Sequence, residues 1–119
     1  MASSSKGLDY SNWTTQVRKG LLELCLLNLL ARGELYGYDL VKELAKVQGL
    51  VITEGTVYPL LSRLKKAGLL KTRLVESPSG PARKYYSLTR EGQLSRAQLN
   101  AYWNELSLGV SSLVKHKGE

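Results

Sequence analysis

Residues 56–88 read TVYPLLSRLKKAGLLKTRLVESPSGPARKYYSL, and within this stretch the spacing of the apolar residues changes. Up to about Ala67 they recur at helical spacing, on a face that comprises Val57, Leu60, Leu61 and Leu64. From Leu70 onward apolar and polar residues alternate, which is the pattern of a strand. The sequence therefore predicts a helix that ends at Gly68 and is followed directly by β-structure.

The second half of the stretch predicts a two-stranded hairpin. Residues 70–75 and 83–88 both alternate, and SPSGP at 77–81 has the composition of a turn or loop. The hairpin carries the four basic residues Lys71, Arg73, Arg83 and Lys84. Because an isolated hairpin is only marginally stable, we expect it to pack against the preceding helices.

The outward face of the predicted helix is small and polar, as suits a helix that enters a groove. It comprises Gly55, Pro59, Ser62 and Lys66, flanked by Thr56, Tyr58 and Arg63. A proline inside a helix removes a hydrogen bond, so its position needs an explanation. Either Thr56 caps the helix and Pro59 lies in the first turn, or the helix starts at Thr53 and kinks locally.

Two more helices are predicted before this stretch. Residues 14–32 are apolar nearly all round, so this helix must be covered on more than one face, either by its own domain alone or by its own domain and a second subunit. Cys25 within it is expected to be a packed small hydrophobe. A second helix is predicted from about Tyr36 to about Val47, followed by a short extended segment at 50–52.

A long helix follows the hairpin, with Thr89 as its expected N-cap. It reaches to about Lys115, a length of roughly 40 Å at 1.5 Å per residue. Its apolar seam has the heptad spacing of a helix pair and comprises Leu99, Trp103, Leu106, Val110 and Leu113. The seam predicts a dimer contact; the alternative is a surface helix that folds back on its own domain.

The charge of the chain is concentrated in one segment. The 119 residues contain 17 Lys and Arg against 10 Asp and Glu, a net charge of +7. Between Arg63 and Arg90 there are eight basic residues and a single acid, Glu76, so the whole excess lies there. Such a block favours contact with a polyanion over a merely solvated surface.

The remaining composition argues against several classes of protein. One Cys and one His cannot build a zinc site or an internal disulfide, and His116 near the end is a poor catalytic candidate. We therefore expect no catalytic residues, no metal and no cofactor. With no signal peptide and no apolar window long enough to span a membrane, the sequence predicts a cytoplasmic protein without a membrane partner.

Three helices followed by a basic hairpin are the element order of a winged helix-turn-helix. The predicted fold is mainly α with a small β-hairpin (α+β), extended by a long C-terminal dimerisation helix. We expect residues 1–13 to be a flexible segment, 14–89 the DNA-binding domain and 90–116 the dimerisation helix. The third helix would enter the major groove, while the hairpin, or wing, would lie along the backbone or the minor groove.

Several blocks of this sequence resemble the PadR family of bacterial transcriptional regulators. They are residues 36–40 (YGYDL), 55–64 (GTVYPLLSRL), 68–70 (GLL), 83–89 (RKYYSLT) and Gly92. The resemblance runs from about Leu21 to Gly92, and the single C-terminal helix is similar to the shorter branch of the family. It implies a homodimer formed by the first and last helices, usually a repressor. Some members release DNA on binding phenolic acids or flat cationic drugs.

The resemblance also implies roles for individual residues. The expected DNA-binding residues are Tyr38, Thr56, Tyr58, Pro59, Ser62, Arg63, Lys66, Ser79, Gly80, Arg83 and Lys84. The expected dimer interface comprises Leu21, Leu24, Leu99, Trp103, Leu106, Val110 and Leu113. The tyrosines Tyr58, Tyr85 and Tyr86 have packing as an alternative role. Trp103 either binds a small aromatic effector at the dimer centre or simply fills the interface.

Together these observations predict a dimeric regulator that binds an inverted repeat in duplex DNA, with half-sites about one helical turn apart. One alternative is a basic RNA- or nucleoid-binding protein without operator specificity. We expect no aromatic stacking platform of the kind many RNA-binding proteins use, which counts against it. The other alternative is a winged-helix module that binds proteins, and the basic wing counts against that.

Overall fold

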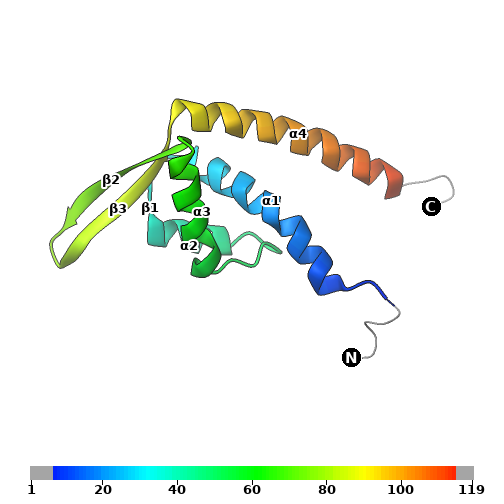
Figure 1. The fold of residues 1–119 in the computed structure, drawn as a ribbon, viewed down its shortest axis with the longest axis horizontal. Helices are drawn as coiled ribbons and strands as arrows, with labels where there is room; N and C mark the ends of the chain where they lie inside the picture. The colour runs from blue at the N-terminus through cyan, green and yellow to red at the C-terminus, as the bar shows by residue number, and fades with distance from the viewer. Residues whose placement is uncertain (1–6, 115–119) are drawn as a thin grey trace.

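The predicted order of elements is present in the computed structural model, which describes residues 7–114 (Figure 1). The elements are α1 (Tyr10–Leu30), β1 (Leu35–Tyr36), α2 (Gly37–Ala45), α3 (Glu54–Lys66), β2 (Leu70–Ser77), β3 (Gly80–Leu88) and α4 (Arg90–Val114). The strands form one antiparallel sheet in the order β1-β3-β2. The α+β winged-helix fold is thus confirmed.

The core is formed by leucines from the first three helices, closed by residues at the base of the sheet. The predicted apolar face of α3 is fully inside it, since Val57, Leu60, Leu61 and Leu64 are all buried. The other members of this cluster are Leu26, Leu27, Leu30, Leu40, Leu44, Leu50, Leu70 and Tyr86. This core fixes the rotation of α3 about its axis and thereby decides which of its residues face solvent.

The first helix is longer at its N-terminus than the sequence indicates. It begins at Tyr10 rather than about Thr14, because the Asp9 carboxylate accepts a hydrogen bond from the Asn12 N–H at 3.0 Å and caps it. Residues 10–13 therefore belong to α1 and not to a flexible segment. Residues 7–9 of the expected N-terminal segment precede this helix and have no regular structure, while residues 1–6 and the last residues of the expected C-terminal helix, 115–116, lie outside the described residues.

The sheet has one strand more than the predicted hairpin. Leu35 and Tyr36 of β1 pair with Tyr86 and Tyr85 of β3, at a point where the sequence predicts the start of a helix. A strand of two residues is too short to show alternation, so no pattern reveals it. β3 also begins earlier than expected, at Gly80, which leaves a turn of only Pro78 and Ser79.

The beginning of α3 resolves the two alternatives for Pro59. Thr53 occupies the N-cap position, and the Thr56 hydroxyl donates to the Thr53 carbonyl at 2.9 Å, so Thr56 is not the cap. Pro59 consequently lies inside the helix, where it cannot donate to the Gly55 carbonyl. Both residues are exposed, so water can satisfy that carbonyl. Residues 50–52, predicted as extended, are irregular and form no strand.

The start of α4 is fixed against the turn between α3 and β2. As predicted, Thr89 is the cap: its hydroxyl accepts from the Gly92 N–H at 3.0 Å and donates to the Gly68 carbonyl at 2.6 Å. Gly92 lies so close to the Leu69 carbonyl that a Cβ at this position would overlap its oxygen. The direction in which α4 leaves the domain therefore depends on a glycine.

Replacing Gly92 with alanine should lower the free energy of unfolding by about 1–3 kcal/mol, because the added methyl group forces the two backbones apart. Urea unfolding followed by circular dichroism measures the change. The matched control is Gly55→Ala, where a Cβ meets only the Thr53 hydroxyl at 3.6 Å. In the first turn of α3 this control should leave the protein as stable as the parent or stabilise it by up to about 0.5–1 kcal/mol, the value for a helix interior. Equal stability of the two variants would contradict the close approach.

Candidate nucleic-acid interface

The outward face of α3 lies where helical spacing places it. Gly55, Thr56, Pro59, Ser62, Arg63 and Lys66 are all exposed, while the opposite face is buried in the core. The side chains at the centre of this face are short, so another surface can approach the helix backbone closely. Hydroxyl, guanidinium and ammonium groups at its margins supply hydrogen-bond donors toward that surface.

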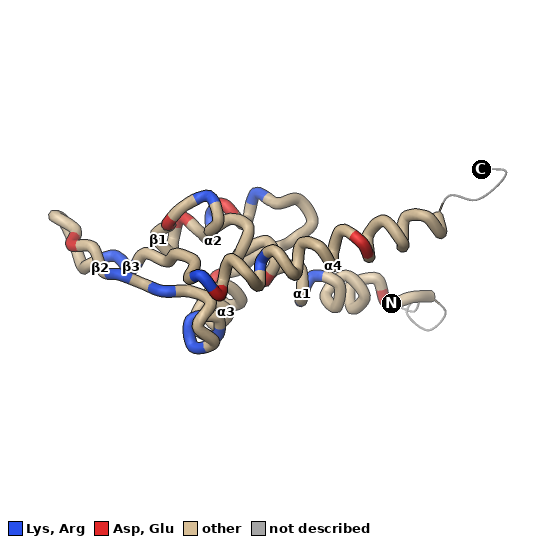
Figure 2. Tube along the Cα trace, turned by 90° about the horizontal axis from the view of Figure 1, so that it is seen from above, with Lys and Arg blue, Asp and Glu red and all other residues tan. Residues whose placement is uncertain are grey.

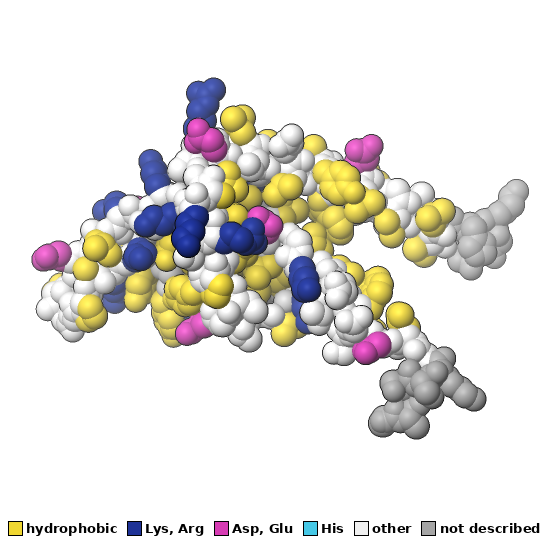
Figure 3. Space-filling view, in the orientation of Figure 1, with side chains coloured by type: hydrophobic (Ala, Val, Ile, Leu, Met, Phe, Trp, Pro, Cys, Tyr) yellow, Lys and Arg dark blue, Asp and Glu magenta, His cyan; other side chains and the backbone are white. Residues whose placement is uncertain are grey.

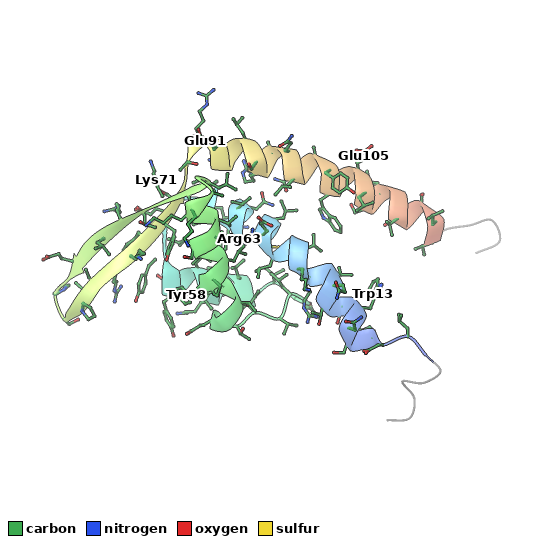
Figure 4. The ribbon with its side chains drawn as sticks, viewed as in Figure 1. Trp13, Tyr58, Arg63, Lys71, Glu91 and Glu105 are labelled. Atoms are coloured by element: carbon green, nitrogen blue, oxygen red, sulfur yellow. The ribbon has the colours of Figure 1, made fainter. Side chains whose placement is uncertain are left out.

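Arg63 lies on the side of α3 that is turned toward α1 (Figure 4). Its guanidinium is 3.6 Å from the Glu23 carboxylate, and its side chain is well exposed. The contact is a single one and is longer than a hydrogen bond, and an exposed pair with this geometry contributes little to stability. Arg63 can therefore exchange Glu23 for a phosphate without a large cost.

Tyr58 is partly packed against the start of α2 and partly exposed. A Cβ on Gly37, at the start of α2, would lie 3.2 Å from the Tyr58 ring, so the ring covers that glycine. Burial is the main reason that the pKa of Tyr58 is raised above its ordinary value. About a third of its surface, 37%, remains exposed, and this part adjoins the outward face of α3.

The wing projects from the helices as a long hairpin (Figure 1). Ser79 and Gly80 lie exposed at its tip, and Arg83 and Lys84 are exposed on β3. Because successive residues of a strand point to opposite faces, the two bases project from different sides of the hairpin. The guanidinium of Arg83 lies 4.8 Å from the centre of the Tyr36 ring, a cation–π contact.

Tyr38 lies in the first turn of α2, close to the base of the wing. Half of its surface, 50%, is exposed, and the Lys42 ammonium lies 5.4 Å from the centre of its ring. It therefore presents a hydroxyl and a neighbouring positive charge to solvent, as a phosphate contact requires.

The basic residues gather over the hairpin and α3 (Figures 2 and 3). One of the four bases of the wing is already engaged within the chain. Arg73 donates two hydrogen bonds to the Glu34 carboxylate, at 2.6 and 2.7 Å, and this contact lowers the pKa of Glu34 below its ordinary value. Among the described residues, Lys66, Lys71, Arg83 and Lys84 have no acidic side chain within 4.0 Å.

Comparison with known proteins assigns this arrangement to a family. The sequence model of the transcriptional regulator PadR-like family matches residues 26–98, which span α3, the wing and the start of α4. The chain belongs to the PadR-like family of transcriptional regulators. It is therefore a DNA-binding regulator and not an enzyme.

Solved structures of PadR-like proteins agree with this assignment. A PadR-like transcription factor from Bacteroides fragilis is 43% identical, with a TM-score of 0.72 over 86% of this chain and 98% of that one. A PadR-like regulator from Bacillus cereus is 36% identical, with a TM-score of 0.77 over 86% and 99%. A regulator of the PadR family from Eggerthella lenta is 37% identical, with a TM-score of 0.78 over 90% and 93%.

In this PadR-like regulator, α1 and α4 leave the core together on the side opposite the wing (Figures 1 and 2). Asn28 and Asn100 join them: each side-chain amide donates to the oxygen of the other, at 2.9 and 2.8 Å. Arg96 also donates to the Asn28 oxygen at 3.1 Å. These polar contacts fix the two helices where they are closest, and the sequence patterns do not reveal them.

Further out, the two helices of the PadR-like regulator diverge and expose apolar side chains (Figure 3). Along the predicted seam of α4 the exposed fraction rises from 38% at Leu99 to 82% at Leu113. The other seam residues, Trp103, Leu106 and Val110, are also exposed, and Trp13 extends from the outer part of α1 (Figure 4). So large an exposed apolar surface is typical of an interaction site.

The two expected interface residues on α1, Leu21 and Leu24, are less exposed than those on α4. Leu21 is half-buried, so it keeps some accessible surface. The sequence predicts Leu24 as an interface residue, but this side chain is only 7% exposed. Leu24 is therefore covered within its own chain and offers almost no surface to a partner. An all-round apolar helix does not reveal which of its leucines the chain itself will bury.

Other kinds of site find little support in the described part of the PadR-like regulator. Among residues 7–114 no group of three His, Cys, Asp or Glu side chains lies close enough to hold a metal ion. None of the described helices has the length and apolarity to cross a bilayer.

Cys25 packs against the core, and burial raises the pKa of its thiol, so the predicted packing role fits.

Proposed function

We propose that this protein is a homodimeric repressor that binds an inverted-repeat operator through α3 and the wing. One observation carries the proposal. The exposed, small-residue face of α3 and the wing bases that have no acidic partner among the described residues, Lys71, Arg83 and Lys84, are arranged as in a DNA-binding winged helix. In this proposal α3 enters the major groove, where base edges present a distinct pattern of donors and acceptors.

The DNA-binding residues fall into two groups by their place in the fold. Thr56, Tyr58, Pro59, Ser62, Arg63 and Lys66 form the groove side, on α3. Tyr38, Ser79, Gly80, Arg83 and Lys84 form the flanking side, at the start of α2 and on the wing. The first group contacts base edges and adjacent phosphates, and the second contacts the backbone or the minor groove.

In this proposal the dimer contact lies on the outer part of α4 and begins at the middle of α1. Every described residue of α4 beyond Ser107 is exposed, and from 97 to 114 its only charged residue is Glu105. A helix arm with this composition gains stability when a second copy covers it. The contact involves Leu21, Leu99, Trp103, Leu106, Val110 and Leu113, and two-fold symmetry then places two α3 helices on one side of the duplex.

We also propose that Trp103 contributes to a site for a small aromatic effector at the dimer centre. The same helix carries a groove of about 450 Å³ that is lined by Tyr102, Leu106, Gly109, Val110 and Leu113 together with Glu105. Trp103 does not line this groove within one chain, so it would join the site only at the dimer centre. Aromatic and apolar walls favour a flat molecule, and the carboxylate favours a positive charge on it. Release of DNA would follow if the effector changes the spacing of the subunits.

Selection of bound duplexes from random DNA tests the proposed function directly. The expected result is enrichment of a palindrome with half-sites about one helical turn apart. A bound pool without an enriched sequence would instead support the nucleoid- or RNA-binding alternative. Repeating the selection in the presence of planar aromatic cations tests the effector, which should reduce the recovered DNA.

A further inference from the structure

The outer face of the sheet carries a row of side chains that joins all three strands. Arg73 of β2 is paired with Tyr85 of β3, which in turn is paired with Tyr36 of β1. The Arg73 guanidinium lies 5.6 Å from the Tyr85 ring centre, and the two tyrosine rings are 5.8 Å apart. We call this row, with Glu34 and Arg83 at its margins, the wing clamp.

The ion pair of the wing clamp spans the width of the sheet. Glu34 precedes β1 at one edge, Arg73 belongs to β2 at the other edge, and β3 lies between them. Both hydrogen bonds, at 2.6 and 2.7 Å, come from different nitrogens of one guanidinium, so the contact is bidentate. Such a fork fixes orientation as well as distance, which a single ammonium contact does not.

The wing clamp lies where the hairpin loses its support from the helices. On the side of the helices, Leu70 and Tyr86 are buried in the core, whereas on the side of the wing tip Leu74, the residue after Arg73, is 67% exposed. Arg83 closes the clamp on the tip side by stacking on Tyr36. The part of the hairpin between Leu74 and Arg83 therefore projects beyond the wing clamp, which is the last row of side chains that connects the hairpin to β1.

We propose that Arg73 is a positioning residue for DNA binding, and that its pairing with Glu34 sets the angle at which the wing tip meets the DNA backbone. This inference rests on the proposed function. Arg73 then has a role different from that of Arg83 and Lys84, because its guanidinium pairs with Glu34 and does not contact phosphate. Tyr36 and Tyr85 are covered by guanidinium groups and are not a free stacking platform.

The decisive experiment compares two variants that each remove one acid. Glu34→Gln opens the wing clamp, whereas Glu76→Gln removes a wing carboxylate that has no basic partner within 4.0 Å among the described residues. Simple electrostatics predicts tighter DNA binding for both, because each adds positive charge near the duplex. If the wing clamp positions the wing, the two variants should change the operator affinity in opposite directions. Glu34→Gln should weaken operator binding about threefold to tenfold, and Glu76→Gln should strengthen it slightly.

The variant Arg73→Lys tests whether the positive charge of Arg73 or its bidentate geometry matters for DNA binding. A lysine keeps the positive charge for a phosphate but loses the bidentate fork, so it should weaken binding as Glu34→Gln does. Affinity is measured by fluorescence anisotropy over a range of salt concentrations. Tighter binding with a steeper salt dependence in Glu34→Gln would show that Arg73 contacts phosphate directly and would overturn the proposal. Unchanged affinity would overturn it as well.

A second measurement does not require DNA. In nitrogen-15 relaxation of the free protein, amides at the wing tip, Ser79 and Gly80, should gain fast motion in Glu34→Gln while the core amides stay as in the parent. Unchanged relaxation at the tip would overturn the wing clamp even if DNA binding falls. If the parent protein bound no duplex at all, the proposed function would fail, and the relaxation data would still decide whether the clamp holds the wing.

Discussion

Replacing Trp103 with glutamate should convert the dimer to monomers and abolish binding to the inverted repeat. Trp103 is 39% exposed at the middle of the α4 seam, so each subunit of the proposed dimer would carry a carboxylate into the apolar contact. Burying an unpaired charge costs several kcal/mol, which is enough to raise the dimer dissociation constant by about a hundredfold or more. A monomer then holds only one half-site and loses the gain from bivalent binding, about 10²–10⁴ in affinity.

Sedimentation equilibrium and anisotropy with an operator duplex measure the two effects. The matched control is Leu108→Glu, because Leu108 is 69% exposed on the same helix but outside the seam. This control should remain dimeric and bind DNA as the parent does. A Trp103→Glu protein that stays dimeric would move the interface from α4 to α1 alone.

The second large effect is expected from Lys66→Ala combined with Arg83→Ala. The two residues represent the two halves of the proposed interface, the outward face of α3 and the wing. Their loss should weaken binding to all duplexes, because phosphate contacts are independent of sequence. The slope of log K against log salt concentration should become shallower by about one for each lost contact, so by about two per bound subunit.

The control for this double variant is Lys46→Ala, which removes a lysine that is paired with Glu43 at 3.0 Å. It should leave both the affinity and the salt dependence close to those of the parent. A double variant with the salt dependence of the parent would show that α3 and the wing do not face the phosphates.

The local parts of the fold were predictable because a periodic pattern or a single residue encodes them. Helical spacing in α3 identifies the buried leucines and, with them, the outward face that includes Ser62 and Lys66. Thr89 predicts the start of α4 because a threonine before a helical pattern supplies a side-chain cap. In both cases the information lies within a few residues of the feature.

The features that the sequence did not reveal depend on contacts between distant residues. Glu34 and Arg73 are separated by 39 positions, and Asn28 and Asn100 by 72, so no local pattern links either pair. The strand β1 is too short for periodicity, and its pairing depends on β3. Leu24 looks like its neighbours on an all-round apolar helix, and only the tertiary fold decides that it is buried.

The composition of the α3 face has a consequence for how many genomic sites the protein occupies. Gly55 and Pro59 offer the bases no side-chain donor, and the hydroxyls of Thr56 and Ser62 can pair with donors and acceptors alike. In the proposed complex, a base change opposite these four residues should therefore cost only about 1 kcal/mol, the low end for specific regulators, whereas the Arg63 guanidinium can discriminate between bases more strongly. Such a protein tolerates imperfect copies of its operator and depends on half-site spacing and DNA deformability to select among them. If α3 binds DNA as proposed, imperfect copies of the operator should be occupied to different degrees, according to the quality of each site.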